Sequence, residues 1–279
     1  MNTLAFSATI AAASFCAGFL GSLTGLGGGF IVTPVLTLVF GADIRYAIGA
    51  SLISIIATSS GAAAAYVKEG FTNLRVGMLL EIATVLGALV GASLVTVFPT
   101  RALFVVFGLV LLGSAYLTSR PRAEHLTADS PPNRLATRLR LDSDYPTPGG
   151  RVRYRVRHLP GGFALMWVAG VLSGLLGIGS GAVKVLAMDQ VMYLPFKVST
   201  ATSNFMIGVT AAASAGIYLR HGYVDPGLAM PVMLGVLAGS VVGARLLFGA
   251  RTERLRQLFA VALLAIAAEM IYKGVAGGG

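Results

Sequence analysis

The chain has few charged residues for its length. Asp, Glu, Lys and Arg make up 11% of its 279 residues, whereas a soluble domain carries about 25%. Hydrophobic residues make up 56% and the mean hydropathy is +0.80. About 20 apolar residues cross a hydrocarbon core about 30 Å thick. This composition excludes an ordinary soluble domain and predicts an all-α polytopic membrane protein.

Residues that bind metals or form disulfides are also scarce. Cys16 is the single cysteine, which excludes an internal disulfide and any CxxC motif. His125, His158 and His221 fall in expected loops without ligand spacing. The string "GSGAVK" lacks the Walker spacing of a phosphate-binding loop. We therefore expect no cofactor, no metal and no catalytic residues, so the chain is not expected to be an enzyme.

The positive charge is concentrated in one segment. Nine of the seventeen arginines lie in residues 120–160, with four acids and no lysine. A basic loop between spans is typical of the cytoplasmic face, so we expect no nucleic-acid partner. Within the loop, "RVRYRVRHL" at 151–159 alternates arginine with apolar residues and could form a β-hairpin with 137–145. The arginines would suit anionic lipid headgroups, and a solvated loop is the alternative.

The N-terminal stretch is apolar and begins without positive charge. Residues 1–20 have no basic n-region of the kind that opens a cleaved signal peptide. We expect this stretch to be the first span.

The sequence contains an internal repeat. Residues 18–94 align without a gap to residues 170–246 at an offset of 152, and identical residues recur along this register. Identical pairs include Gly18/Gly170, Gly25/Gly177, Gly27/Gly179, Gly29/Gly181, Ser51/Ser203, Tyr66/Tyr218, Gly70/Gly222, Gly87/Gly239 and Gly91/Gly243. We therefore expect two repeats, 1–119 and 161–279, joined by the linker 120–160.

Each repeat contains five apolar segments, which gives about ten transmembrane segments. They are about 3–24, 29–40, 46–67, 74–98 and 101–119, then 161–176, 181–194, 198–219, 226–247 and 253–272. The second segment of each repeat is short and follows a glycine run, "GLGGG" in the first and "GIGSG" in the second. Paired short, glycine-interrupted segments indicate the binding site of a transporter.

The short second segments either span the membrane or re-enter it. If they span, the repeats are inverted, and a cytoplasmic linker leaves 16 Lys or Arg inside and 4 outside. If they re-enter, the repeats are parallel, and the count is 13 inside and 7 outside. The cluster Arg245, Arg251, Arg254 and Arg256 makes this difference. The charge distribution favours inverted repeats.

Lys184 is the most unusual residue of the apolar segments. It lies three residues after Gly181, and its repeat mate is Val32. A cation near a helix N-terminus is unfavourable unless an anion lies close by. We expect Lys184 to contact an anionic substrate; snorkelling to the interface or pairing with Asp189 is the alternative.

Further candidate residues surround the glycine runs and the third segments. A broken helix could offer backbone N–H groups to an anion, although glycines also serve close helix packing. Hydroxyl and amide groups at the third segments could donate to an oxyanion or join helices. The expected binding residues are Lys184, Gly27, Gly28, Gly29, Gly179, Ser180, Gly181, Ser51, Thr202, Ser203 and Asn204. The intramembrane acids Glu81 and Glu269 are structural carboxylates or proton carriers.

The two glycine-containing stretches resemble a known family. "GFLGSLTGLGGGFIVTPVL" with "GASL", and "GVLSGLLGIGSGAVKVLAMDQ" with "ATSNF", are similar to the sulfite exporter TauE/SafE family. The resemblance covers nearly the whole chain outside the linker. It implies transport, usually export, of sulfite or organosulfonates such as sulfoacetate across a bacterial or archaeal inner membrane.

The sequence therefore predicts a secondary transporter of a small anion, with alternating access at a mid-membrane site. The alternatives are an anion channel, a transporter of another carboxylate or oxyanion, a membrane enzyme, and a scaffold or sensor acting through its linker. Membrane lipids are expected partners, and a homodimer is possible.

Overall fold

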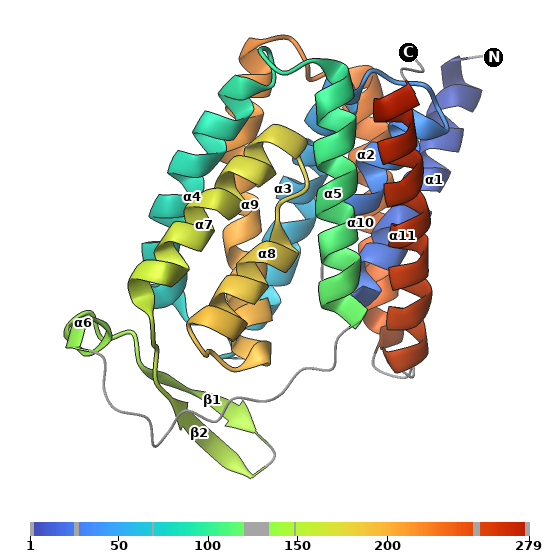
Figure 1. Cartoon of the computed structure of the whole chain (residues 1–279). Coiled ribbons are helices and arrows are strands. Elements are labelled where there is room, and N and C mark those ends of the chain that lie inside the picture. The colour runs from blue at the N-terminus through green and yellow to red at the C-terminus, as the bar shows by residue number, and fades with distance from the viewer. Residues whose placement is uncertain are drawn as a thin grey trace.

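The computed structural model of the chain is a bundle of helices with a small hairpin at one end (Figure 1). It describes residues 3–24, 28–68, 70–119, 134–147, 149–247 and 252–276. The helices of the first half are α1 (Thr3–Thr24), α2 (Gly29–Leu38), α3 (Ile44–Lys68), α4 (Leu74–Leu94) and α5 (Thr100–Ser119). The all-α fold expected from the sequence is confirmed.

The second half has a similar series of helices. They are α7 (Leu159–Leu176), α8 (Gly181–Leu186), the π-helical turn η1 (Ala187–Val191), α9 (Phe196–Arg220), α10 (Pro226–Leu247) and α11 (Thr252–Ala276). Between the halves lie a short helix and two strands: α6 (Arg134–Arg138), β1 (Ser143–Thr147) and β2 (Gly150–Tyr154).

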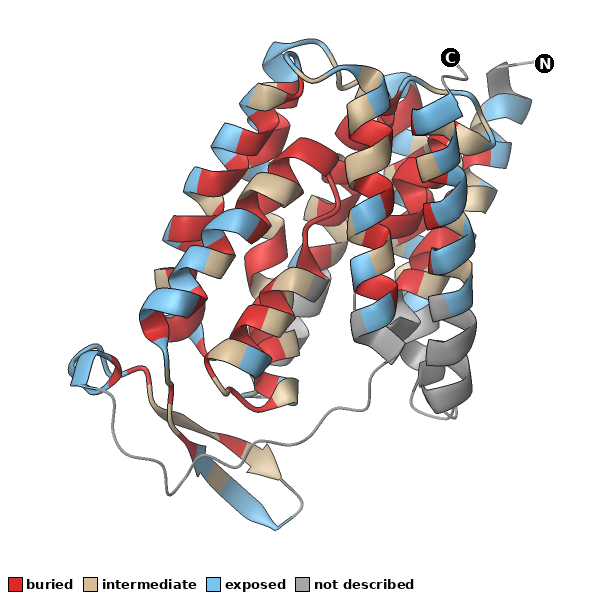
Figure 2. Ribbon diagram, viewed as in Figure 1, coloured by how far each residue is buried: buried red, intermediate tan, exposed pale blue. Residues whose placement is uncertain are grey.

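The helices are apolar on their outer surface as well as inside. On α4, Met78, Ile82 and Leu86 are each more than half exposed and recur every four residues, which makes an apolar stripe on the outside of the bundle. Helices α4 and α7 are long and apolar enough to cross a bilayer. The described parts of α1, α2, α3, α5 and α10 are apolar but shorter. The helices carry exposed positions on the outside of the bundle and buried positions inside it (Figure 2). Large apolar side chains at many of the exposed positions suit contact with lipid rather than with water.

The helices pair across the two halves. Helix α1 packs along α10, α4 along α7, α5 along α11 and α3 along α9. The first helix of each half therefore contacts the fourth helix of the other. The third and fifth helices each contact their own counterpart.

Glycines allow the closest of these contacts. A Cβ on Gly18 would meet the backbone oxygen of Val236, and a Cβ on Gly170, its repeat mate, would meet that of Thr84. Thr84 and Val236 are themselves 152 residues apart. Gly87 and Gly239 show the same relationship, against Trp167 and Phe15. These glycines permit backbone approach between helices, as small residues commonly do in membranes.

Aromatic contacts define which helix ends lie together. Tyr46, at the start of α3, contacts Tyr223, just after α9, with ring centroids 5.7 Å apart. Helices α3 and α9 therefore run in opposite directions. His158, at the start of α7, contacts Tyr193, just after η1, at 6.0 Å. The α7–α8–η1 segment therefore returns to the end of the bundle at which it began.

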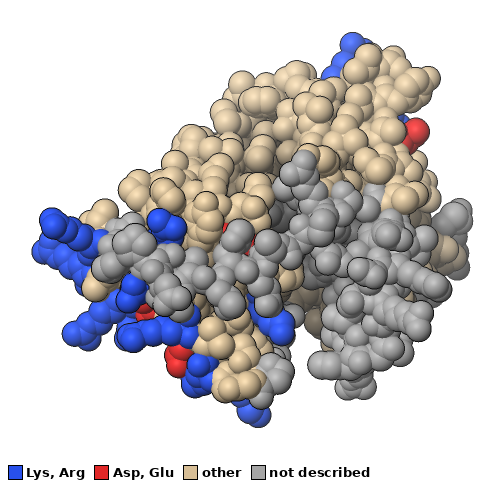
Figure 3. Space-filling view, turned by 60° about the horizontal axis from the view of Figure 1, so that its bottom comes forward, with Lys and Arg blue, Asp and Glu red and all other residues tan. Residues whose placement is uncertain are grey.

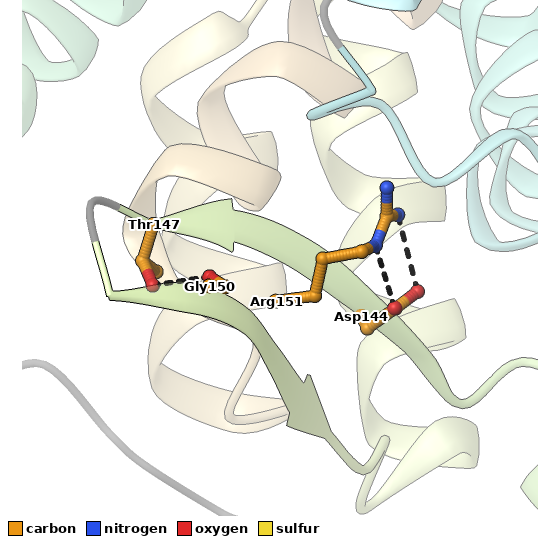
Figure 4. A network of polar contacts seen from close by, with 4 residues as sticks. All are labelled: Asp144, Thr147, Gly150 and Arg151. Carbon is orange, nitrogen blue, oxygen red and sulfur yellow. Dashed lines mark hydrogen bonds and ion pairs between the residues drawn. The ribbon is translucent and has the colours of Figure 1, made fainter.

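The linker forms a hairpin at one end of the bundle (Figure 1). Strands β1 and β2 are antiparallel, with Tyr145 opposite Val152. On its exposed side Asp144 accepts two hydrogen bonds from Arg151, at 2.6 and 3.2 Å (Figure 4). The pair lowers the pKa of Asp144, chiefly through the hydrogen bond from Arg151. Lys and Arg gather on this end of the molecule (Figure 3).

The other side of the linker is buried against the helices. Tyr145, Tyr154 and Val156 are at most 4% exposed and belong to one apolar cluster with residues of α4, α7, η1 and α9. The described part of the linker is therefore packed on the bundle. A loop surrounded by water would not bury these side chains.

Candidate functional site at the broken helix

The helix of the second half is interrupted at the glycine run. Helix α7 ends at Leu176 and α8 begins at Gly181, and the residues between them are buried. Gly177 and Gly179 have φ of 62° and 68°, in the left-handed region that glycine adopts without strain. Ser180 has φ of 44°, which is strained for a residue with a side chain. Its hydroxyl oxygen is buried without a hydrogen-bond partner.

The first half is broken at the equivalent place. Gly28 caps α2, which begins at Gly29, and α1 ends at Thr24. Gly27, a candidate binding residue, lies outside the described residues. Gly28 and Gly29 are buried. Unwound backbone at this depth requires cover by protein or a polar cavity, because lipid cannot satisfy its polar groups.

Two serines hold the broken segments in the same way. Ser203 donates to the carbonyl oxygen of Gly181 at 3.3 Å. Ser51, its repeat mate, lies 3.4 Å from the carbonyl oxygen of Gly29, and at 2.9 Å it donates to Gly177. The start of each short helix is thus tied to the third helix of its own half. In this conformation both serine hydroxyls donate to backbone carbonyl oxygens.

Lys184 is fully buried, and hydrogen bonds connect it to α9 and, through α9, to α4. Its Nζ donates to Oγ1 of Thr210 on α9 at 2.6 Å. The Thr210 hydroxyl lies 2.6 Å from Oε1 of Glu81 on α4. The hydroxyl also lies 3.0 Å from the carbonyl oxygen of Met206, one turn earlier on α9. An ammonium only donates, so Lys184 donates to Thr210, and the single hydroxyl hydrogen goes to the nearer acceptor, the carboxylate of Glu81. The three side chains form a charge-bridging relay, which we call the Lys184–Thr210–Glu81 relay.

At the acidic end of the relay, only one of the two carboxylate oxygens of Glu81 has a hydrogen-bond partner. Glu81 is 8% exposed, and its second oxygen, Oε2, is buried without a hydrogen-bond partner. Asp189, the alternative partner expected for Lys184, accepts from the Gln190 amide at 2.8 Å. Its Oδ1 is also buried without a partner. Buried carboxylate oxygens without partners are costly, and such groups are commonly kept for function.

The two candidate acids are in different environments. Glu81 lies inside the bundle, within the relay. Glu269 lies at an exposed position of α11, a helix that packs chiefly against α5. Only Glu81 of the two is therefore bonded to Lys184 through Thr210.

The remaining candidates lie nearer the linker. The hydroxyl of Thr202 accepts from the backbone N–H of Asn73 at 3.0 Å. Asn204 is half-buried on the same helix. Asn73 also caps α4 and donates from Nδ2 to Leu141 and Tyr154 of the linker, at 2.9 and 2.8 Å. Asn73 therefore connects the linker, α4 and the predicted binding segment.

Two of these connecting residues were missed by the sequence analysis. Thr210 occupies the same repeat position as Thr58, and this identity was the available signal. Asn73 matches Asp225, and both cap the helix that follows, α4 and α10. Among the described residues, no group of three His, Cys, Asp or Glu side chains could hold a metal ion.

The fold and this site define a class of protein. It is a helical membrane protein in which paired helix breaks lie in corresponding places of two halves, beside buried ionisable groups, an arrangement typical of membrane transporters.

Comparison with known proteins agrees. The family model of the sulfite exporter TauE/SafE matches residues 10–270, so the chain belongs to that family and is a membrane transporter.

Several curated relatives match the chain over most of their own length. The probable membrane transporter protein YunE of Bacillus subtilis is 29% identical over 268 residues, which cover 93% of this chain and 95% of the relative. YdhB of the same organism, also named a probable membrane transporter protein, is 27% identical, with 83% and 86% covered. The probable membrane transporter protein MJ0441 of Methanocaldococcus jannaschii is 26% identical, with 83% of each chain covered. No solved structure matches the chain.

Proposed function

We propose that this chain is a secondary transporter of small sulfur-containing anions, such as sulfite and sulfoacetate, with export as its usual direction. It would lie in a bacterial or archaeal inner membrane, with residues 120–160 in the cytoplasm. The family description supports a sulfur oxyanion as substrate. The observation that carries the proposal is the fully buried ammonium of Lys184, one turn into the helix that follows the break.

The depth of the relay supports a mid-membrane site. Asn73 bonds to Thr202 at the linker end, and Glu81 bonds to Thr210 eight residues further along both helices. Eight helical residues rise about 12 Å, so the relay lies about 12 Å inside the linker end of the bundle. In a hydrocarbon core about 30 Å thick this depth is close to the middle.

Inverted repeats are part of the proposal. The opposite directions of α3 and α9 support them, as does the return of the α7–α8–η1 segment to its starting end. Five crossings per half place the basic linker and the arginine cluster at 245–256 on one side. Transporters of this kind alternate access by rocking one repeat against the other.

One hydroxyl group close to Lys184 in the chain suits an oxyanion. Ser180, four residues before Lys184, has a buried hydroxyl without a hydrogen-bond partner. A hydroxyl donor satisfies an oxygen of a sulfonate without adding a buried charge. The hydroxyl of Thr210 remains bonded to Glu81.

Transport by purified protein in liposomes tests the proposal. Wild type should take up labelled sulfite and sulfoacetate with saturation, and Lys184→Ala should lose uptake at least tenfold. Lys197→Ala, which removes an exposed lysine at the start of α9, is the matched control and should keep the wild-type rate. Uptake that rises linearly with concentration would indicate a channel instead. No flux of either anion in wild type would refute the substrate.

A further inference from the structure

The relay balances one buried positive charge with one buried negative charge. Lys184 is fully buried and Glu81 is 8% exposed, so neither charge is compensated by bulk water. An isolated buried charge is far more costly than a paired one. If an anion binds Lys184 while Glu81 is ionised, the site holds two negative charges against one positive charge. If Glu81 is protonated, the bound anion takes its place as the counter-charge.

We infer that Glu81 and the substrate anion alternate as the counter-charge of Lys184, so that each anion crosses together with one proton carried by Glu81. This inference rests on the proposed function, because it requires the anion to bind at Lys184. In the conformation described here the carboxylate holds Lys184 through Thr210. When the anion binds, Glu81 takes up a proton from the aqueous solution on the same side of the membrane. The anion and the proton then both leave on the opposite side.

The unpartnered carboxylate oxygen of Glu81 is the site at which the proton would bind. Oε2 is buried without a hydrogen-bond partner, whereas Oε1 accepts from Thr210. A proton on Oε2 turns this oxygen into a donor and leaves the bond from Thr210 to Oε1 intact. The neutral carboxyl group could then donate to an oxygen of the bound anion. Protonation therefore converts a group that repels the anion into one that binds it.

Few other charges face the relay. Besides Lys184, the α8–η1 segment carries Asp189, five residues further on. The sequence of α7 has no ionisable side chain. The basic residues of α4, α9 and α5, namely Arg75, Lys197, Arg220 and Arg101, lie in the terminal turns of their helices. Asp189 is therefore the competing proton carrier, and the test must distinguish it from Glu81.

Coupling of this kind has a direct energetic consequence. Sulfoacetate carries two negative charges at neutral pH, so its complex with one proton carries one. An inside-negative membrane potential drives that complex outward, which agrees with export. A pH difference acts separately, since protons on one side favour loading on that side.

The test measures accumulation of labelled sulfoacetate in liposomes whose potential is clamped at zero with potassium and valinomycin. At one-to-one coupling, making the exterior about one pH unit more acidic should raise steady-state accumulation by about tenfold in wild type. Glu81→Gln, which cannot carry the proton, should show accumulation that does not respond to the pH difference. Asp189→Asn should retain the wild-type response. Loss of the response in Asp189→Asn, or its persistence in Glu81→Gln, overturns the inference.

Thr210→Val and its repeat mate provide a matched pair. Thr210→Val removes the bridging hydroxyl and should weaken the pH response. Thr58→Val removes a hydroxyl whose hydrogen bonds, within the described part of the chain, go to the carbonyl oxygens of Ser54 and Ile55 on its own helix. This variant should leave accumulation unchanged. An equal effect of the two substitutions would assign Thr210 a packing role only.

A second measurement needs no variant. A pH dye inside the liposomes should report acidification when sulfoacetate enters wild type, with about one proton for each anion. Anion entry without proton entry would overturn the inference and leave the proposed transport function intact. Absence of both sulfoacetate and sulfite flux under any gradient would instead refute the proposed function itself.

Discussion

Lys184 and Glu81 bond to the same hydroxyl, that of Thr210, over 2.6 Å on each side. Because both charges are buried, removing either one leaves the other uncompensated, at a cost of about 3–5 kcal/mol. Lys184→Met and Glu81→Gln should therefore each lower the melting temperature. The double variant should lose less free energy of unfolding than the two single variants together, by about 1 kcal/mol or more. Thermal unfolding in detergent measures all four proteins, and strictly additive losses would mean that the two charges are not coupled.

The close helix contacts predict where glycine is indispensable. Gly170→Ala places a methyl group against the backbone oxygen of Thr84, so α4 and α7 must move apart. We expect a loss of about 1–3 kcal/mol, as in other overpacked contacts. Gly216→Ala on α9 is the control, because nothing lies within 4 Å of the added methyl group. That variant should be neutral or more stable by up to about 1 kcal/mol. Unfolding midpoints of the two variants and of wild type, measured in the same detergent, test this prediction. Equal midpoints for the two variants would contradict it.

Ser180 carries backbone strain and an unsatisfied hydroxyl together. Its φ of 44° suits glycine, and its buried Oγ has no partner. Ser180→Gly should therefore raise the stability of the empty protein by about 1 kcal/mol. If the hydroxyl serves the anion, the same variant should bind sulfoacetate more weakly. Opposite changes in melting temperature and in affinity support this role, and unchanged affinity would leave Ser180 with no part in binding.

The contact between the linker and the bundle should depend on pH at Tyr154. Burial is the main cause that raises the pKa of Tyr154 from 10.0 to about 12. Below pH 10 the tyrosine is neutral whether docked or released, so the contact is fully present. Between 10 and 12 a released tyrosine loses its proton and a docked one keeps it, so docking weakens as the pH rises. The difference of about two pKa units is worth about 2–3 kcal/mol. Protease cleavage of residues 134–157 should therefore increase above pH 10.

A variant without the ionisable group is the control for this prediction. Tyr154→Phe removes the oxygen that accepts from Asn73 and should abolish the pH dependence, with a small loss of docking at neutral pH. Arg151→Ala, which breaks the exposed pair with Asp144, should leave cleavage nearly unchanged. A pH dependence that persists in Tyr154→Phe would assign the effect to another group.

The sequence was sufficient for the helices and their breaks because these depend on local composition. Apolar runs become helices in lipid, since only internal hydrogen bonds can satisfy their backbone. Closely spaced glycines end a helix, as at Gly177 and Gly179, because they adopt left-handed conformations without strain. The register of 152 residues between the halves was also readable, and it relates Ser51 and Ser203, which contact equivalent glycines.

Which residues form the site depends on the tertiary structure. Glu81 and Glu269 are both flanked by apolar residues in the sequence, which offered no way to choose between them. Helix packing turns Glu81 inward and leaves Glu269 on an exposed face. The relay also joins residues far apart in the chain, and its central hydroxyl is that of an ordinary threonine on a long helix. Such a contact depends on how α4, α8 and α9 rotate and cross, which is set by packing across the whole bundle and not by spacing along any one segment.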